Sequence, residues 1–425
     1  MAGATGCSRS RRRFERLPDS TIDETPEAQL DALTAQRGDA NRAFFVSEAP
    51  TLARLCHAMA ERFARGGRLI GFGSSPAARS DARHVAVEFV HPVIVGKRAL
   101  PALALTGDGG PLDRQVRLLT GPDDIAIAFG AGVGESEVAA AVAAARDRGC
   151  LTIAFAPAGA EWEFYPPTSD SSIAQELVET LYHVLWELVH VFFEHRGLLE
   201  GRSERRTHDA GASSFLYPFL DERERDLDPV LDDVRRSVLM KSDEIGALRE
   251  QTLSEGRAPL LAAADALRAS FAAGGKLLAL GNGGSATDAM DVVADLRAGA
   301  GKPALDLTED PAILTAIAND IGVDAIFSRQ VIAYGAPGDV LLALSTSGNS
   351  ANVIEALAQA RRDGLGTIAM VGYDGGRVAA ERLADHVVIT RSEHIPRIQE
   401  AQASAYHALV ALVALAAVTP GGPRR

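Results

Sequence analysis

The chain has 425 residues, of which 47% are hydrophobic and 23% charged, so it can form two or three domains with sizeable apolar cores. Its net charge of −13 argues against broad binding of nucleic acid or acidic membranes. The cysteines, Cys7, Cys56 and Cys150, are too few and too widely spaced for a disulfide framework or a zinc finger, which favours a cytoplasmic protein. No apolar run has membrane-spanning length, and the arginine-rich start lacks the apolar part of a secretory signal.

Taken in order, the chain divides into four parts. Residues 1–40 are polar, first basic and then acidic, which predicts a partly disordered tail with a short helix near Pro26–Ala35. Over 41–200, helical segments alternate with short apolar strands, the pattern of a doubly wound parallel sheet with helices on both faces. Residues 201–229 are charged and contain Gly and Ser, which predicts a linker. The alternation of helix and strand resumes over 230–420.

The two alternating parts also match each other in sequence. The clearest pairs are FARGGRLIGFG with FAAGGKLLALG (63–73 and 271–281) and PDDIAIAF with PGDVLLAL (122–129 and 337–344). In addition, Gln175 and His183 are eight residues apart, as are Gln399 and His407. These matches predict two tandem copies of one three-layer α/β/α unit.

Two strand-to-helix turns in the second half have the composition of a phosphate site. One apolar strand enters Gly281-Asn282-Gly283-Gly284-Ser285, where glycines let backbone N–H groups and a helix start approach an anion. The turn fits neither common nucleotide-binding glycine motif. Another strand enters a hydroxyl-rich turn, so the candidate phosphate ligands of the two turns are Asn282, Gly283, Ser285, Ser345, Thr346, Ser347 and Ser350. The alternative for each turn by itself is an ordinary capped helix start.

Five stretches resemble one known family. GNGGSATDAM, NDIGVDAIFSRQV, GDVLLALSTSGNSANVIEAL, VGYDGG and RIQEAQ, in this order and spacing, resemble the phosphoheptose isomerase branch of the SIS (sugar isomerase) domain family. The resemblance covers roughly 234–418, and the first half resembles the family far more weakly. It implies two tandem SIS domains and isomerisation of a sugar phosphate such as sedoheptulose 7-phosphate. It also implies active sites between subunits, hence a homo-oligomer built as a dimer of the fused pseudo-dimer.

The resemblance also implies a set of site residues. Members of the family carry His-x-x-x-Glu after the glycine turn and, on a later helix, Gln followed eight residues on by His; these four can bind zinc, and the Glu and the last His are the proposed acid–base pair. The second half keeps Gln399 and His407 but has Asp291 and Asp295 in place of the His and the Glu. Two aspartates with one His and one Gln suit a hard cation better than zinc.

The first half shows the opposite pattern. It has all four family residues, which are His84, Glu88, Gln175 and His183. Its turns, however, are degraded. GSSPAA (73–78) stands in place of GNGGSA, with one residue extra before the helix, the six residues 130–135 contain no hydroxyl, and Glu135 falls where Ser350 stands in the other half. A carboxylate at that turn should repel a phosphate.

These observations lead to the hypothesis of a composite site. The turns of the second half would bind phosphate, and the four residues of the first half would hold a divalent metal such as zinc. Glu88 would remove the proton next to the carbonyl, and His183, or His407 in the other copy, would return it. Asp320 matches an acidic position near the family's sugar site and would bind sugar hydroxyls or cap a helix.

A second hypothesis belongs to another class. The chain would be a non-catalytic, sugar-phosphate-binding regulatory or accessory protein on the same fold, since neither half alone carries the full set. The sequence leaves open whether the two groups of residues share one pocket, whether Asp291 and Asp295 bind metal, and which sugar phosphate is bound.

Overall fold

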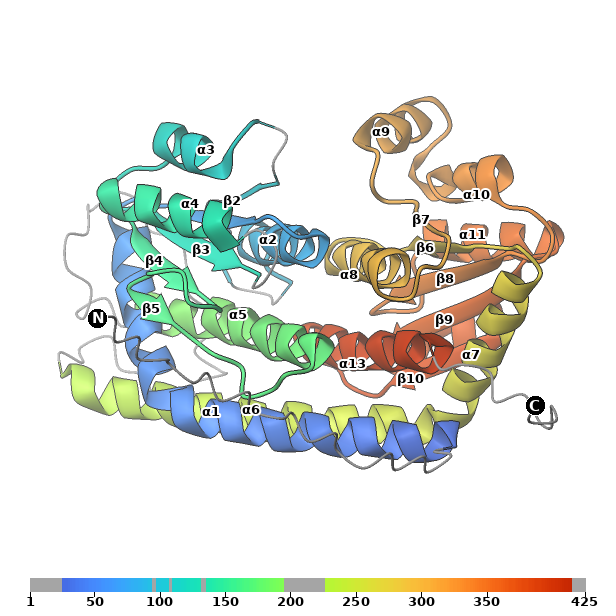
Figure 1. Cartoon of the computed structure of the whole chain (residues 1–425), viewed down its shortest axis with the longest axis horizontal. Helices are drawn as coiled ribbons and strands as arrows, with labels where there is room; N and C mark the ends of the chain where they lie inside the picture. Colours follow the sequence, from blue (N-terminus) through green and yellow to red (C-terminus); the bar gives the residue numbers. More distant parts are fainter. Residues whose placement is uncertain (1–24, 94–96, 107–108, 131–134, 195–225, 415–425) are drawn as a thin grey trace, which may run out of the picture.

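The computed structural model describes residues 25–93, 97–106, 109–130, 135–194 and 226–414. In these residues the strands form two five-stranded sheets, ordered β2-β1-β3-β4-β5 and β7-β6-β8-β9-β10, in which neighbouring strands run parallel. The two orders correspond strand by strand, so both halves have the same topology (Figure 1). The predicted fold class, α/β with two helix-flanked parallel sheets, is confirmed.

The elements of the first half are α1 (Pro26–Ala64), β1 (Leu69–Gly73), α2 (Pro76–Val90), β2 (Ala102–Leu105), α3 (Leu112–Leu119), β3 (Ile125–Phe129), α4 (Glu135–Asp147), β4 (Leu151–Ala154), β5 (Trp162–Glu163) and α5 (Ser171–Glu194). The second half begins with α6 (Leu227–Glu255), α7 (Arg257–Ala272), β6 (Leu277–Leu280), α8 (Gly284–Ala294), a π-helical turn (Asp295–Gly299) and β7 (Ala304–Asp306). It continues with α9 (Pro311–Asp320), a 3-10 turn (Val323–Ala325), α10 (Ser328–Tyr334), β8 (Val340–Ser345), α11 (Ala351–Arg362), β9 (Gly366–Gly372), α12 (Gly376–Ala380), β10 (His386–Thr390) and α13 (Ile395–Ala414).

Each sheet is covered by helices on both faces because its central strands are apolar on both faces. In β1, Leu69 belongs to the core under α1, α2 and α5, whereas Ile70 and Phe72 belong to the core under α3 and α4. In β6, Leu277 packs with residues of α7, α8 and α13, and Leu278 packs with residues of α10 and α11. One face of each sheet thus carries the helices that meet the other half.

Helices of the first half pack against helices of the second. The helices α2 and α8 pack together, as do α5 and α13, and the long helices α1 and α6 run side by side beneath both sheets (Figure 1). Leu30, near the start of α1, packs in the core of the second half, while Val230 and Val234 of α6 pack in the core of the first. The Ser80 hydroxyl donates to the carbonyl oxygen of Thr287 at 2.8 Å, which ties α2 to α8.

The helix predicted near Pro26–Ala35 is present and is longer than its composition predicted. The tail expected over 1–40 is helical from Pro26 onward, with Thr25 Oγ1 accepting a hydrogen bond from the Ala28 N–H, because Leu30 is buried against the opposite half. Residues 1–24 lie outside the described residues. So do residues 201–225 of the predicted linker, after which α6 begins at Leu227.

Two further predictions concern cysteines and membranes. Cys56 and Cys150 are buried and free, and Cys7 lies outside the described residues. A membrane-spanning helix would need a long apolar run, and none of the helices in the described ranges has one.

Candidate active site

The helices α5 and α13 carry the same polar pattern into the centre of the molecule. Residues 175–183 of α5 have the sequence QELVETLYH, and residues 399–407 of α13 have QEAQASAYH. Both segments therefore contain Gln-Glu, a hydroxyl residue four positions after the Glu, and Tyr-His. Because α5 packs against α13, the two patterns face each other.

Each of the two histidines is held by a glutamate from the opposite half. His183 Nδ1 lies 2.9 Å from Glu400 Oε1, and His407 Nδ1 lies 2.9 Å from Glu176 Oε1. A carboxylate at Nδ1 favours the tautomer with its proton there, which leaves Nε2 to bind a metal or a substrate. Within the described structure, Nε2 of both histidines is buried without a hydrogen-bond partner.

Buried arginines keep both glutamates charged. Burial by itself would raise the pKa of Glu400, but the charges and hydrogen bonds of Arg397, His183 and Arg249 lower it. In the same way, Arg37, His407 and Arg249 outweigh burial and lower the pKa of Glu176. Thr180 donates to Glu400, and Ser404 donates to Glu176. Both histidines therefore have an ionised partner.

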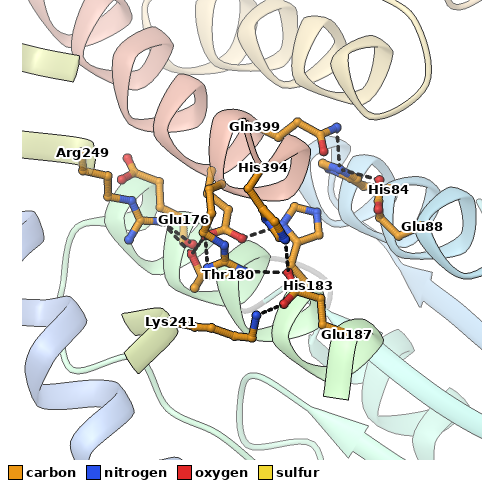
Figure 2. Close-up of polar contacts among 12 residues, drawn as sticks. His84, Glu88, Glu176, Thr180, His183, Glu187, Lys241, Arg249, His394 and Gln399 are labelled. Atoms are coloured by element: carbon orange, nitrogen blue, oxygen red, sulfur yellow. Dashed lines mark hydrogen bonds and ion pairs between the residues drawn. The ribbon is translucent and has the colours of Figure 1, made fainter. Parts of the chain in front are cut away.

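His84 lies where α2, α5 and α13 meet. Its Nε2 is 3.8 Å from Glu88 Oε1 and 3.5 Å from Gln399 Nε2, and its ring centroid is 5.0 Å from that of His183. Figure 2 shows Gln399 extending from α13 toward His84. Burial, and then the nearby His183, lowers the pKa of His84 well below its ordinary value, so its imidazole is neutral and able to bind a metal. We call His84, Glu88, His183 and Gln399 the histidine set.

The equivalent residues of the two halves form a second group. His407 Nε2 is 3.6 Å from Asp295 Oδ2, and Gln175 lies beside Asp291, where its amide partly offsets the rise in the pKa of that carboxyl. We call Asp291, Asp295, His407 and Gln175 the aspartate set.

The two sets exchange their glutamines. The sequence predicted Gln175 together with His84, whereas the structure places Gln399 beside His84 and Gln175 beside Asp291. Each Gln is eight residues, or about 12 Å of helix, before the His of its own helix. Because of this distance along the helix, each Gln lies in a different set from the His of its own helix. Gln399 of α13 lies beside His84, and Gln175 of α5 lies beside Asp291. His407, expected as an acid–base residue, likewise lies in the aspartate set.

The glycine turn of the second half contacts the histidine set. A Cβ atom added to Gly284 would lie 1.8 Å from Gln399 Nε2 and 2.6 Å from His84 Nε2. Only a glycine permits this approach. The start of α8, which the sequence proposed as part of a phosphate site, thus adjoins the histidine of the other half.

The second turn is linked to the first. Asn282 and Asn352 exchange two amide hydrogen bonds of 2.9 and 3.0 Å, which connect the glycine turn to the start of α11. In the second turn, Ser345 Oγ accepts from the Gly348 N–H and Ser347 Oγ from the Asn349 N–H. The remaining predicted ligands of the two turns lie in place as follows: Gly283 is exposed with φ +59°, Ser285 is buried, Thr346 is half-buried, and Ser350 begins α11 without a side-chain capping bond.

Asp320 lies apart from these contacts. It ends α9, is exposed, and accepts a hydrogen bond from Asn319 Nδ2 at 2.8 Å. With Ile317 and Arg329 it lines a groove between α9 and α10. Its predicted role toward a sugar has no supporting contact among the described residues.

Glu179 is a candidate site residue that the motif comparison missed. Ligand atoms of His84, Glu179 and His183 all lie within 4.8 Å of one another. Glu179 precedes His183 by four residues, a spacing that places both on one face of a helix and was a usable signal. Burial, and then the carboxyls of Asp288, Glu400 and Asp81, raise the pKa of Glu179 well above its ordinary value.

The residues around His84 fit a divalent metal. Glu179 Oε1, His183 Nε2, Glu88 Oε2 and Gln399 Oε1 are buried and, across the described ranges, lack hydrogen-bond partners. Two imidazoles with carboxylate and amide oxygens are ligands that zinc accepts. A cation would also offset the repulsion among the buried carboxyls nearby, since burial and mutual repulsion raise the pKa values of Asp288 and Asp291.

Comparisons with known proteins show two kinds of similarity. A family model described as the SIS domain matches residues 242–372. The phosphoheptose isomerase of Rhodospirillum rubrum is 46% identical over 162 residues, which cover 37% of this chain and 85% of that protein. The phosphoheptose isomerase of Chlorobium phaeobacteroides is 41% identical over 203 residues, which cover 46% of this chain and 85% of that protein.

A solved structure extends the likeness to both halves. The C-terminal domain of glucosamine-fructose-6-phosphate aminotransferase from Francisella tularensis matches with a TM-score of 0.57 and 9% identity, covering 90% of this chain and 94% of that one. At this identity the match shows the fold alone. The two-sheet arrangement is therefore shared with a solved protein. The candidate site residues are assigned from the sequence and structure of this chain and not from that match.

Proposed function

Because the chain belongs to the SIS domain family and phosphoheptose isomerases are among its relatives, we propose that it is a sugar-phosphate isomerase that interconverts an aldose and a ketose phosphate such as sedoheptulose 7-phosphate. The observation that carries the proposal is the contact of Gly284 with His84 and Gln399. Through this contact, the glycine turn of the second half, a proposed phosphate site, lies next to the proposed acid–base residues of the first half.

The turns of the second half bind the phosphate in this proposal. The hydroxyls of Ser345, Thr346, Ser347 and Ser350 and the N–H groups at the start of α11 are the donors, and α8 adds the positive end of its dipole. The paired amides of Asn282 and Asn352 fix the distance between the turns. The phosphate therefore anchors the substrate with its sugar directed toward His84.

The histidine set holds the reacting end of the sugar. His84, Glu179 and His183 would hold a divalent metal, with Gln399 beside them, and such an ion would polarise the carbonyl and the adjacent hydroxyl. Glu400 orients His183 for this role through its Nδ1. The geometry thus favours His183 as a ligand rather than as the proton donor first expected.

Glu88 is the residue proposed to move the proton. It lies beside His84, and its Oε2 has no partner in the described parts of the chain. Burial raises its pKa above the ordinary value, with Glu187 and Glu400 adding to the rise and His183 opposing it, so its carboxylate is a stronger base than in water. Glu88 takes the proton from the carbon next to the carbonyl, giving an enediolate, and returns it to the neighbouring carbon.

The test is paired. Bound metal and the isomerisation of sedoheptulose 7-phosphate are measured for the purified protein, for His84→Ala and for Ser347→Ala. We expect both substitutions to abolish turnover and His84→Ala alone to lose metal. If the parent binds the sugar phosphate through Ser347 but neither holds metal nor turns the sugar over, the isomerase proposal fails. The protein would then be a sugar-phosphate-binding regulatory or accessory protein.

A further inference from the structure

The first half contains a cavity that the proposed reaction does not use. It has a volume of about 440 Å³ and lies at the ends of β1 and β3, between their turns and the start of α5. Its walls include Ser75, Gly130, Phe155, Tyr165 and Thr168, and Asp295 reaches it from the second half. This is the size of a typical small-molecule site. By the common topology it corresponds to the place of the phosphate turns in the second half.

The walls exclude an anion. Asp81, Asp170 and Asp295 line the cavity, and no Lys, Arg or His is found among its described lining residues. The β1–α2 turn has Pro76 and Ala77 where the other half has glycines, so its backbone cannot approach a phosphate in the same way. Whether or not these carboxyls are ionised, walls without a cationic side chain offer a phosphate no opposite charge to bind.

The same walls suit a polyhydroxylated molecule. Hydroxyl residues gather at the start of α5, namely Thr168, Ser169, Ser171 and Ser172, and Phe129, Phe155 and Tyr165 supply apolar ring surface. Gln175 also lines the cavity, where its side-chain amide lies beside the carboxyls of Asp81 and Asp291. An amide at the cavity wall can both donate to and accept from the hydroxyl of a ligand.

We propose that this cavity is a second binding site, distinct from the histidine set, for a neutral polyhydroxylated ligand of the class of unphosphorylated sugars. Hydroxyls of the ligand bond to Gln175, to the serines and threonine at the start of α5, and to Asp81 and Asp295. Its C–H faces pack on the aromatic side chains. Burial raises the pKa of Asp81 to about 8, so its carboxyl can donate as well as accept, as sugar hydroxyls require, and the carboxyl oxygens of Asp295 accept.

Ala174 is the position at which the site can be closed. It lines the cavity and corresponds to Ile398, which is fully buried in the second half. Ala174→Ile therefore introduces a side chain that this position already holds in the other half, and Ala174→Phe fills more of the cavity. Tyr165 is half exposed, so Tyr165→Ala removes a wall with little effect on folding.

The experiment measures binding of sedoheptulose and of glucitol to the full chain by titration calorimetry and saturation-transfer NMR. We expect saturable binding that weakens at least about tenfold in Ala174→Phe, less in Ala174→Ile and about threefold or more in Tyr165→Ala. Ser347→Ala should bind these probes as the parent does, and inorganic phosphate should not compete with them. Unchanged melting temperatures of Tyr165→Ala and Ala174→Ile show that the losses are local.

Three results would overturn the proposal: no saturable binding of either probe, binding that survives Ala174→Phe but disappears in Ser347→Ala, or displacement of the probes by inorganic phosphate. The last two would place the neutral sugar in the phosphate turns of the second half. Since turnover is not the readout, failure here is distinguishable from failure of the proposed isomerase function.

Discussion

The histidine set and the aspartate set occupy equivalent places in the two halves, and the helices that support them are almost interchangeable. In each, an imidazole Nδ1 lies 2.9 Å from a glutamate of the opposite half, and a hydroxyl residue supports that glutamate. The sets differ in what α2 and α8 contribute. The histidine set has His84 and Glu88 from α2, and the aspartate set has Asp291 from α8 and Asp295 from the π-helical turn after it. The supporting helices therefore fix the place of a site, and the residues facing them determine its chemistry.

Their surroundings differ in a complementary way. The histidine set adjoins a glycine turn through Gly284, whereas the aspartate set adjoins, through Asp295 and Gln175, an acidic cavity without a cationic residue among its described lining. Within one chain, the turns proposed to bind phosphate accompany the metal-type ligands, and the acidic cavity accompanies the carboxylates of the aspartate set. This pairing is the basis for proposing one site for a charged substrate and one for an uncharged ligand.

The largest expected effect comes from breaking the histidine set. His84→Asn removes a buried ligand atom at the glycine turn, and we expect turnover to fall by about a thousandfold or more. The matched change in the other set, Asp291→Asn, should alter turnover by less than about threefold, because Asp291 faces Gln175 rather than His84. The measurement is steady-state turnover and bound-metal content of His84→Asn and Asp291→Asn, each compared with the parent. Equal losses would show that the two sets act as one site.

The next effect concerns the contact between the halves. Gly284→Ala places a methyl group 1.8 Å from Gln399 Nε2 and 2.6 Å from His84 Nε2, so both must move. We expect about a hundredfold loss of turnover, since displacement of about 1 Å is enough for such a loss. Gly299→Ala is the control, because nothing lies within 4 Å of its added Cβ. If Gly284→Ala retained full activity, the turn would not belong to the reacting site.

How much of this comparison the sequence could predict depends on the range of the contacts. Apolar strands alternating with helices were sufficient to predict the two sheets, because a strand that is buried on both faces is a continuous apolar run in the sequence. The glycine turn was also recognisable, because Gly284 is required by a close approach that a Cβ would block. These features depend on a few consecutive residues.

The exchange of Gln175 and Gln399 could not be predicted in this way. The spacing of eight residues places a Gln and a His on similar faces of one helix but does not say which neighbouring helix the Gln reaches. That choice is made by the packing of α5 on α13, between residues more than two hundred positions apart. The continuity of α1 from Pro26 to Ala64 was underestimated for the same reason, because Leu30 packs in one apolar core with Leu253 and Leu260 of the other half.

A smaller effect is expected from the glutamates that orient the histidines. Glu400→Gln and Glu176→Gln each remove the carboxylate that pairs with a buried arginine. Both should therefore lower the free energy of unfolding by about 2–4 kcal/mol. Only Glu400→Gln should also lower kcat, by about 10- to 100-fold, because it frees His183. Urea unfolding and kinetics of the two variants separate the roles. A similar loss of kcat in Glu176→Gln would assign His407 to the reaction.

The smallest effect is one of pH on stability. Burial raises the pKa of Asp81 to about 8, against the hydrogen bonds of Gln175 and Tyr182, which lower it. Between about pH 4 and pH 8 the unfolded carboxyl is ionised while the folded one keeps its proton, so the stability present below pH 4 is lost as the pH rises toward 8. Asp288, Asp291 and Glu179, whose pKa values are also raised, act in the same direction.

The substitution Asp81→Asn isolates this contribution. The lowered pKa of His84 acts in the opposite sense, and its effect fades as the pH rises above the unfolded value of about 6.5, so the difference between parent and variant from pH 7 to pH 8 reports Asp81. Urea unfolding with a chelator present should show the parent losing stability over this range. Asp81→Asn should flatten the slope by at most about 1.4 kcal/mol per pH unit, while Asp147→Asn on the surface of α4 should not change it. A slope unchanged by Asp81→Asn would mean that Asp81 is ionised in the folded protein, which would favour a cationic rather than a neutral ligand in the cavity it lines.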